Sequence, residues 1–153
     1  MLGRFKMTVQ ECRDEYEAFM NEVFPKQSGF KNAFNMLVHS GKWDDEVLEK
    51  VIKRLVKKRL GQDGDKVLLK DPSEPNPACK VFVTATKSVG ANNSGPALFC
   101  SYDNPVELKS YENIKLWQAA RATSASPTYF KPMTIGDETF VDGGLQANNP
   151  LGW

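Results

Sequence analysis

Apolar side chains recur at helical spacing near the start of the chain. The first apolar stripe follows Thr8 and stops before Pro25, which predicts a helix over about residues 9–24. Thr8 and Glu11 have the spacing of a capping box, in which each side chain satisfies the backbone N–H of the other residue. We therefore expect an amphipathic first helix whose N-terminus is closed by this pair.

A second apolar stripe begins at Asp44 or Asp45 and continues to Gly61, a residue suited to end a helix. The last turns of this predicted helix carry five cations, in the segment Lys53–Arg59. One interpretation is a basic patch for anionic lipid, which would give the protein a peripheral membrane contact. The other is a solvated face with cations favoured at a helix C-terminus, and the pattern favours this second interpretation.

The second half of the chain changes to strand patterns. Residues 81–86 are nearly continuous in apolar and β-branched side chains, as in a strand that is covered on both faces. Residues 97–102 follow after a short Gly/Asn/Ser/Pro loop, which favours antiparallel neighbours or a pair at a sheet edge. Met133–Ile135 and Thr139–Val141 flank the turn Gly136–Glu138, so a hairpin is predicted there.

Between these strands, residues 116–125 predict a helix with unusually small side chains, which Pro127 stops. Small residues allow a helix to lie close to a sheet or to another backbone. Near the end of the chain, Asn148 and Asn149 precede Pro150, an arrangement that favours the start of a new helix.

Composition narrows the class of protein. The chain has 153 residues, enough for one domain with a core, and its net charge of +1 does not indicate a nucleic-acid partner. No apolar run approaches the roughly 20 residues of a spanning helix. Three cysteines, Cys12, Cys79 and Cys100, are far apart and suggest neither a zinc site nor a disulfide framework. They favour a reduced, cytoplasmic location.

The candidate chemistry lies in the stretch Thr139–Leu145. A β-branched and aromatic run delivers the carboxylate of Asp142 onto two glycines, Gly143 and Gly144. Such a pattern presents an acid at the tip of a strand, although it is also typical of a turn aspartate. The only histidine, His39, stands beside Ser40, but adjacent side chains usually point apart, which favours a surface or turn residue.

Three segments carry a family resemblance in order and spacing: Trp117–Pro132, Phe140–Leu145 and Ala147–Pro150. Together they resemble the C-terminal half of a patatin-like phospholipase domain. The resemblance implies an α/β fold of three layers with a mostly parallel central sheet. It also implies a serine acyl hydrolase that uses a Ser–Asp dyad without metal or cofactor on a lipid or acyl-ester substrate.

By this resemblance Asp142 is the acid of the dyad and accepts the proton of the serine hydroxyl. A serine hydroxyl is a poor nucleophile until a neighbouring group takes its proton. A carboxylate within about 2.6–3.2 Å can do so. Gly143 and Gly144 complete the motif and let the chain turn beside the acid without crowding the serine.

The chain departs from the family pattern in one respect. No serine stands in a G-x-S-x-G elbow, and no glycine-rich oxyanion segment is present. We therefore expect a single partial domain over residues 1–153, truncated at both ends and inactive alone, with the N-terminal strands and nucleophile missing. The strand at 81–86 should then expose an unpaired edge. Alternatives are a non-catalytic lipid-binding or interaction fragment, or the product of an incomplete gene model.

Overall fold

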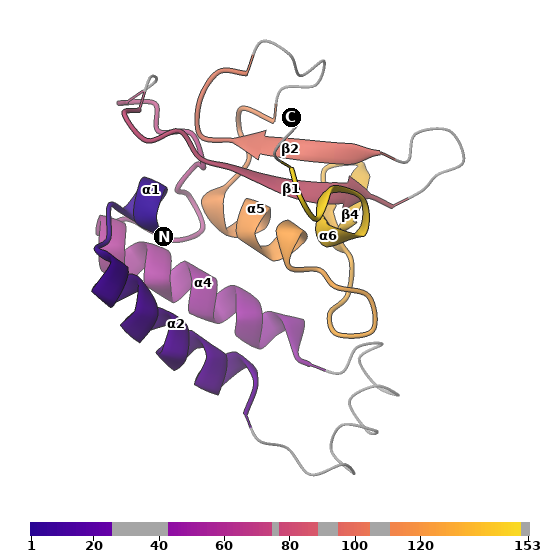
Figure 1. Cartoon of the computed structure of the whole chain (residues 1–153), viewed down its shortest axis with the longest axis horizontal. Coiled ribbons are helices and arrows are strands. Elements are labelled where there is room, and N and C mark those ends of the chain that lie inside the picture. The colour runs from indigo at the N-terminus through magenta and orange to yellow at the C-terminus, as the bar shows by residue number, and fades with distance from the viewer. Residues whose placement is uncertain (26–42, 75–76, 89–94, 105–110, 151–153) are drawn as a thin grey trace.

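The computed structural model describes residues 1–25, 43–74, 77–88, 95–104 and 111–150. Helices and strands follow one another along these segments (Figure 1). In chain order they are α1 (Leu2–Phe5), α2 (Val9–Val23), α4 (Asp45–Leu60), β1 (Phe82–Lys87), β2 (Pro96–Cys100), α5 (Leu116–Thr123), β3 (Met133–Ile135), β4 (Glu138–Asp142) and α6 (Gly144–Ala147).

The helix ends follow the capping signals in the sequence. The backbone N–H of Thr8 donates to Glu11 Oε2 at 2.8 Å, and Glu11 N–H donates to Thr8 Oγ1 at 3.2 Å, which confirms the capping box of α2. Asp44 caps α4, and Gly61 ends it with a φ of 66°. A left-handed residue after the last turn is the usual role of glycine at a helix C-terminus.

The described strands form one sheet in the order β2-β1-β4-β3, and every neighbouring pair is antiparallel. The prediction of an α/β fold is confirmed, but the prediction of a mostly parallel sheet is wrong for these strands. Parallel neighbours need a long crossover, whereas β1–β2 and β3–β4 are joined by short connections. The β3–β4 hairpin then brings β4, and not β3, against β1.

The expected unpaired edge at residues 81–86 is found in part. Strand β1 pairs with β2 from Phe82 to Thr86, but on its other side β4 pairs only with residues 85–87, so Phe82–Thr84 have no strand partner there among the described residues. Side-chain pattern indicated that β1 is covered on both faces, but it carried no information about which strands would flank it. The outer positions of the described sheet belong to β2 and β3.

The helices α5, α4 and α2 are stacked in that order away from the sheet (Figure 1). Helix α5 contacts β1, β3 and β4, and α4 separates α5 from α2. The shared core includes the fully buried Val56 of α4, Ala122 of α5, Phe99 of β2 and Phe140 of β4. Phe99 and Phe140 meet edge-to-face with ring centroids 5.3 Å apart, which favours a tight contact across the sheet.

Some predictions fall outside this description. His39 and Ser40 lie beyond the described residues, as does any helix that would continue past Pro150. The short helix α6 was not predicted, and Asn148 ends it. No helix in the described ranges is long and apolar enough to cross a membrane.

Candidate active site

Asp142 is the last residue of β4, as the sequence predicted, and its backbone is fixed from two sides. On one side it pairs with Ala85 in the central strand β1. On the other, its N–H donates to the carbonyl of Ala125 at 3.0 Å, just beyond the end of α5. The carboxylate is thus placed where the sheet meets the end of a helix, and it is neither buried nor fully exposed.

The Asp142 side chain makes one hydrogen bond within the described residues. Gly144 N–H donates to Asp142 Oδ1 at 2.8 Å. The second oxygen, Oδ2, has no hydrogen-bond partner in this part of the chain. A carboxylate held through one oxygen and open at the other can accept a proton from a hydroxyl placed against it.

Gly143 and Gly144 are required for space and not for backbone conformation. Neither has a positive φ. A Cβ on Gly143 would lie 2.2 Å from the carbonyl oxygen of Thr84 in β1, and a Cβ on Gly144 would lie 3.2 Å from Asp142 Oδ1. The glycines therefore allow the chain beyond the acid to lie directly against the central strand.

The small side chains predicted for residues 116–125 allow α5 to lie close to the sheet. Ala119, Ala122 and Ala125 are each at most 1% exposed. Larger side chains would push α5 away from β1 and β4, and the carbonyl of Ala125 would then lose its bond to Asp142. The sequence signalled this close approach, but it did not reveal that a backbone carbonyl there holds the acid.

An apolar groove lies between the N-terminal helices and α5. Its volume is about 280 Å³, and its wall includes Met1 and Phe5, Phe19 of α2, and Ala120 and Ser124 at α5. The groove therefore joins the first residue of the chain to the end of α5, next to the carbonyl that holds Asp142.

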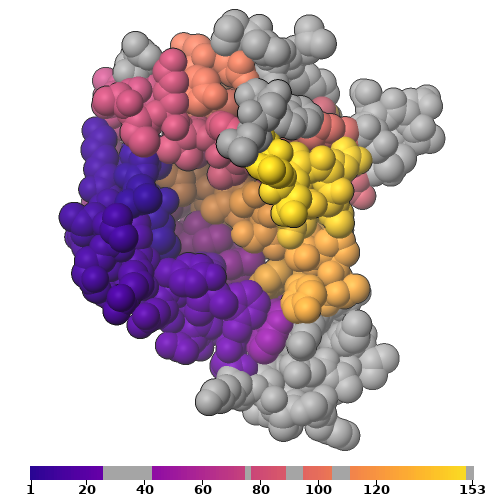
Figure 2. All heavy atoms as spheres, in the orientation of Figure 1, coloured from indigo at the N-terminus to yellow at the C-terminus, as the bar shows by residue number. Residues whose placement is uncertain are grey.

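The end of β4 is close to the molecular surface. Figure 2 shows the segment around α6, in yellow, on the outside of the molecule, and Leu145 in this helix is 58% exposed. Among the described residues, no serine or histidine donates a hydrogen bond to Asp142, and no three side chains of metal-binding type come together. The structure thus brings Asp142, Gly143 and Gly144 together without a nucleophile.

Most cations of Lys53–Arg59 form ion pairs with carboxylates of the protein itself. Arg59 donates to Glu11 Oε1 at 2.9 Å, Lys58 pairs with Glu15, and Arg54 pairs with Glu22, so the cations of α4 face the carboxylates of α2. These hydrogen bonds hold the pKa values of Glu15 and Glu22 below their usual range.

Lys53 at the start of the same stretch is also engaged. Its Nζ lies 2.8 Å from Asp65 Oδ1 and 4.0 Å from the centroid of the Trp117 ring. Most of the basic stretch therefore joins helices and neighbouring loops to one another.

Comparisons with known proteins identify the family of the chain. Residues 2–152 match the family described as patatin-like phospholipase. The chain is 30% identical to calcium-independent phospholipase A2-gamma of Mus musculus over 98% of its own length and 19% of that protein's length. It is also 30% identical to the cGAMP-activated phospholipase of Vibrio cholerae, covering 94% of the chain and 38% of the relative.

A third relative is named for a lack of activity. The chain is 32% identical to probable inactive patatin-like protein 9 of Arabidopsis thaliana, covering 73% of the chain and 26% of that protein. No solved structure gives a significant match. The match over residues 2–152, together with the relatives, shows that the chain belongs to the patatin-like phospholipase family.

Proposed function

We propose that this chain provides the acid half of a lipid acyl hydrolase that works through a Ser–Asp dyad. The carrying observation is Asp142 at the end of β4, with one carboxylate oxygen bound by Gly144 N–H and the other without a partner among the described residues. In this role Asp142 takes the proton of a serine hydroxyl as the serine attacks the ester carbonyl. The acyl group is then carried on the serine until water releases it as a fatty acid.

The 153 residues contain no G-x-S-x-G elbow, so in this proposal the serine is supplied by a segment outside them. We propose the apolar groove as the place where that segment packs. Met1 and Phe5 line the groove with small residues of α5, and Ser124 in its wall precedes Ala125, whose carbonyl holds Asp142.

Without a nucleophile the chain should have negligible activity by itself. A missing oxyanion donor alone costs roughly 10²–10³ in rate, and loss of the serine removes the covalent route. The relative from Arabidopsis thaliana, named as probably inactive, is a precedent for a patatin-like protein without activity. We further propose a cytoplasmic location with a peripheral lipid surface as the place of the substrate, which the three free thiols support.

A chimera tests this proposal. The segment that precedes the matched region in the Mus musculus relative is joined to Met1, and hydrolysis of a fluorogenic acyl ester is measured. We expect activity in the chimera, none in the unextended chain, and loss of activity in the chimera with Asp142→Asn. Asp137→Asn is the matched control because Asp137 is an exposed aspartate in the neighbouring hairpin turn.

Two results would contradict the proposal. Hydrolysis by the unextended chain that depends on Asp142 would show that a nucleophile is present among the 153 residues. Equal activity of the Asp142→Asn and Asp137→Asn chimeras would remove Asp142 from the mechanism.

A further inference from the structure

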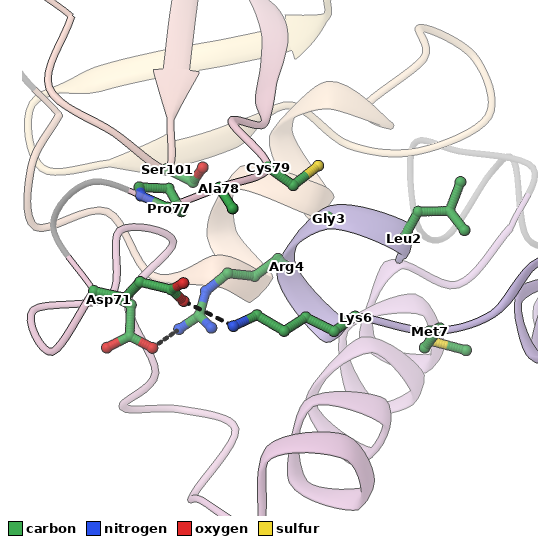
Figure 3. A pocket seen from close by; sticks show the side chains of 11 residues that line it. Leu2, Gly3, Arg4, Lys6, Met7, Asp71, Pro77, Ala78, Cys79 and Ser101 are labelled. Carbon is green, nitrogen blue, oxygen red and sulfur yellow. Dashed lines mark hydrogen bonds and ion pairs between the residues drawn. The ribbon is translucent and has the colours of Figure 1, made fainter.

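A separate cavity of about 430 Å³ lies where α1 meets residues 71–74, residues 77–79 and Ser101 (Figure 3). None of its lining residues belongs to β4 or α6, so it is distinct from the site at Asp142. Its volume falls in the range of roughly 300–1,000 Å³ that is typical of small-molecule sites.

Two cations and two carboxylates line this cavity and alternate in sign. Arg4 Nη2 lies 3.3 Å from Asp71 Oδ2, and Lys6 Nζ lies 2.9 Å from Glu74 Oε2. Figure 3 shows the Arg4 and Lys6 side chains reaching toward the Asp71 segment from α1. The charges in the cavity therefore balance, and the rest of its wall is mostly apolar, with Leu2, Met7 and Ala78 among its residues.

The Arg4 guanidinium is fixed in place by hydrogen bonds to the backbone. Its Nε donates to the carbonyl of Leu69 at 3.0 Å and its Nη2 to that of Leu68 at 3.4 Å. Its Nη1 has no hydrogen-bond partner in the described residues. Because the other nitrogens fix the plane of the guanidinium, Nη1 can donate to an anion at a small cost in side-chain entropy.

Two serines and the backbone of Lys6 also fit a binding role. Ser73 donates two hydrogen bonds to Asp71, and these hold the pKa of the Asp71 carboxyl below its usual range, so it stays ionised. Ser101 is 3% exposed, and its hydroxyl accepts from Val81 N–H but makes no donation within the described part of the chain. Lys6 has a φ of 51°, an unfavourable conformation for a residue with a side chain.

We propose that this cavity binds a small zwitterion that carries a phosphate and an ammonium group, as in phosphoethanolamine. The phosphate accepts hydrogen bonds from Arg4 Nη1 and Lys6 Nζ, and the ammonium group donates to Asp71 and Glu74. The Lys6–Glu74 pair is solvent-exposed and contributes little to stability, so it can rearrange around such a ligand. This proposal does not depend on hydrolysis at Asp142.

The test is a titration of the purified chain with O-phosphoethanolamine, inorganic phosphate and ethanolamine. Binding is followed by the backbone amide NMR signals of residues 2–7, 78 and 79. We expect O-phosphoethanolamine to bind at least tenfold more tightly than either of the other two probes. Lys6→Met and Glu74→Gln should each weaken its binding about tenfold. Lys66→Met, at an exposed lysine outside the cavity, should leave binding unchanged.

Lys6→Gly separates a binding role from a structural one. Glycine adopts a positive φ without strain, so this variant should melt at the same temperature as the wild type or higher, yet bind about tenfold more weakly. Equal binding of phosphate and O-phosphoethanolamine would overturn the proposal, as would wild-type binding by Lys6→Met.

The ligand could be the headgroup of a lipid or a free soluble molecule, and vesicles distinguish these two sources. Flotation with vesicles that contain phosphatidylethanolamine, lost in Lys6→Met, would support a lipid headgroup as the ligand. Binding of free O-phosphoethanolamine without flotation would support a soluble one. Absence of both would overturn the proposal.

Discussion

The glycine after the candidate acid offers a sharp test of how the site is built. In Gly143→Ala the new Cβ would lie 2.2 Å from the Thr84 oxygen and 2.5 Å from its carbonyl carbon. Both atoms belong to the backbone of β1, where Thr84 pairs with Leu98 of β2, so no side-chain rotation can relieve the contact. The loop after β4 would have to move by about 1 Å.

The cost of this movement can be estimated from other overpacked sites, which lose about 1–3 kcal/mol. Because the clash is with backbone, we expect the upper end, about 3 kcal/mol, or a fall in melting temperature of about 6–12 °C. Urea and thermal unfolding followed by far-UV circular dichroism measure both quantities. The displaced loop should also lose the hydrogen bond from Gly144 N–H to Asp142.

Gly95→Ala is the matched control. Among the described residues, no atom lies within 4 Å of the Cβ that this substitution would add. It should therefore leave the free energy of unfolding within about 1 kcal/mol of the wild type, and could raise it. If Gly143→Ala and Gly95→Ala unfolded at the same midpoint, the close packing of the loop against β1 would not exist in solution.

Three further predictions concern the helices. Thr8→Ala removes the cap of α2 and should lower the free energy of unfolding by about 1 kcal/mol in a urea titration, whereas an unchanged midpoint would show that the capping box contributes nothing. The Thr8 backbone N–H, and next Arg59, lower the pKa of Glu11 from 4.5 to about 2. Its stabilising effect is therefore complete above about pH 4.5 and lost as the pH falls toward 2, so Glu11→Gln should flatten the stability profile in that window. Arg121 is 1% exposed, and its Nη2 donates to the Lys131 carbonyl at 2.7 Å. Arg121→Met removes this donor and should lower the free energy of unfolding by about 1.5–3 kcal/mol in the same titration. A decrease below about 0.5 kcal/mol, the scatter of surface substitutions, would contradict this.

Local signals in the sequence were sufficient for most elements of the fold. The cap at Thr8, the stop at Gly61 and the hairpin turn at Gly136, where φ is 60°, each depend on residues that are neighbours in the chain. The antiparallel order around β1 could not be predicted in this way. It depends on which distant strand reaches Ala85, and side-chain alternation does not encode that partner.

The candidate site was also predicted only in part. The position of Asp142 at a strand end could be predicted from the pattern of residues 139–145, whereas its proposed role as the acid of a dyad depends on the family resemblance. The carbonyl of Ala125 and the backbone of Thr84 could not, because both contribute main-chain atoms that any residue would offer. The basic stretch was ambiguous for a related reason: a cation shows its charge in the sequence but not the carboxylate opposite it.

The position of α2 has a consequence for how the molecule opens. This helix is the outermost of the stack, and its ion pairs with α4 include side chains that are exposed to water, where salt competes with them. Tyr16 and Phe19 of α2 also form part of the wall of the apolar groove. Partial release of α2 would therefore widen the groove while β1, β4 and the Ala125 carbonyl kept Asp142 in place. Helix α2 should therefore open without the strands that hold Asp142. Hydrogen exchange should resolve α2 and the sheet as separate cooperative units.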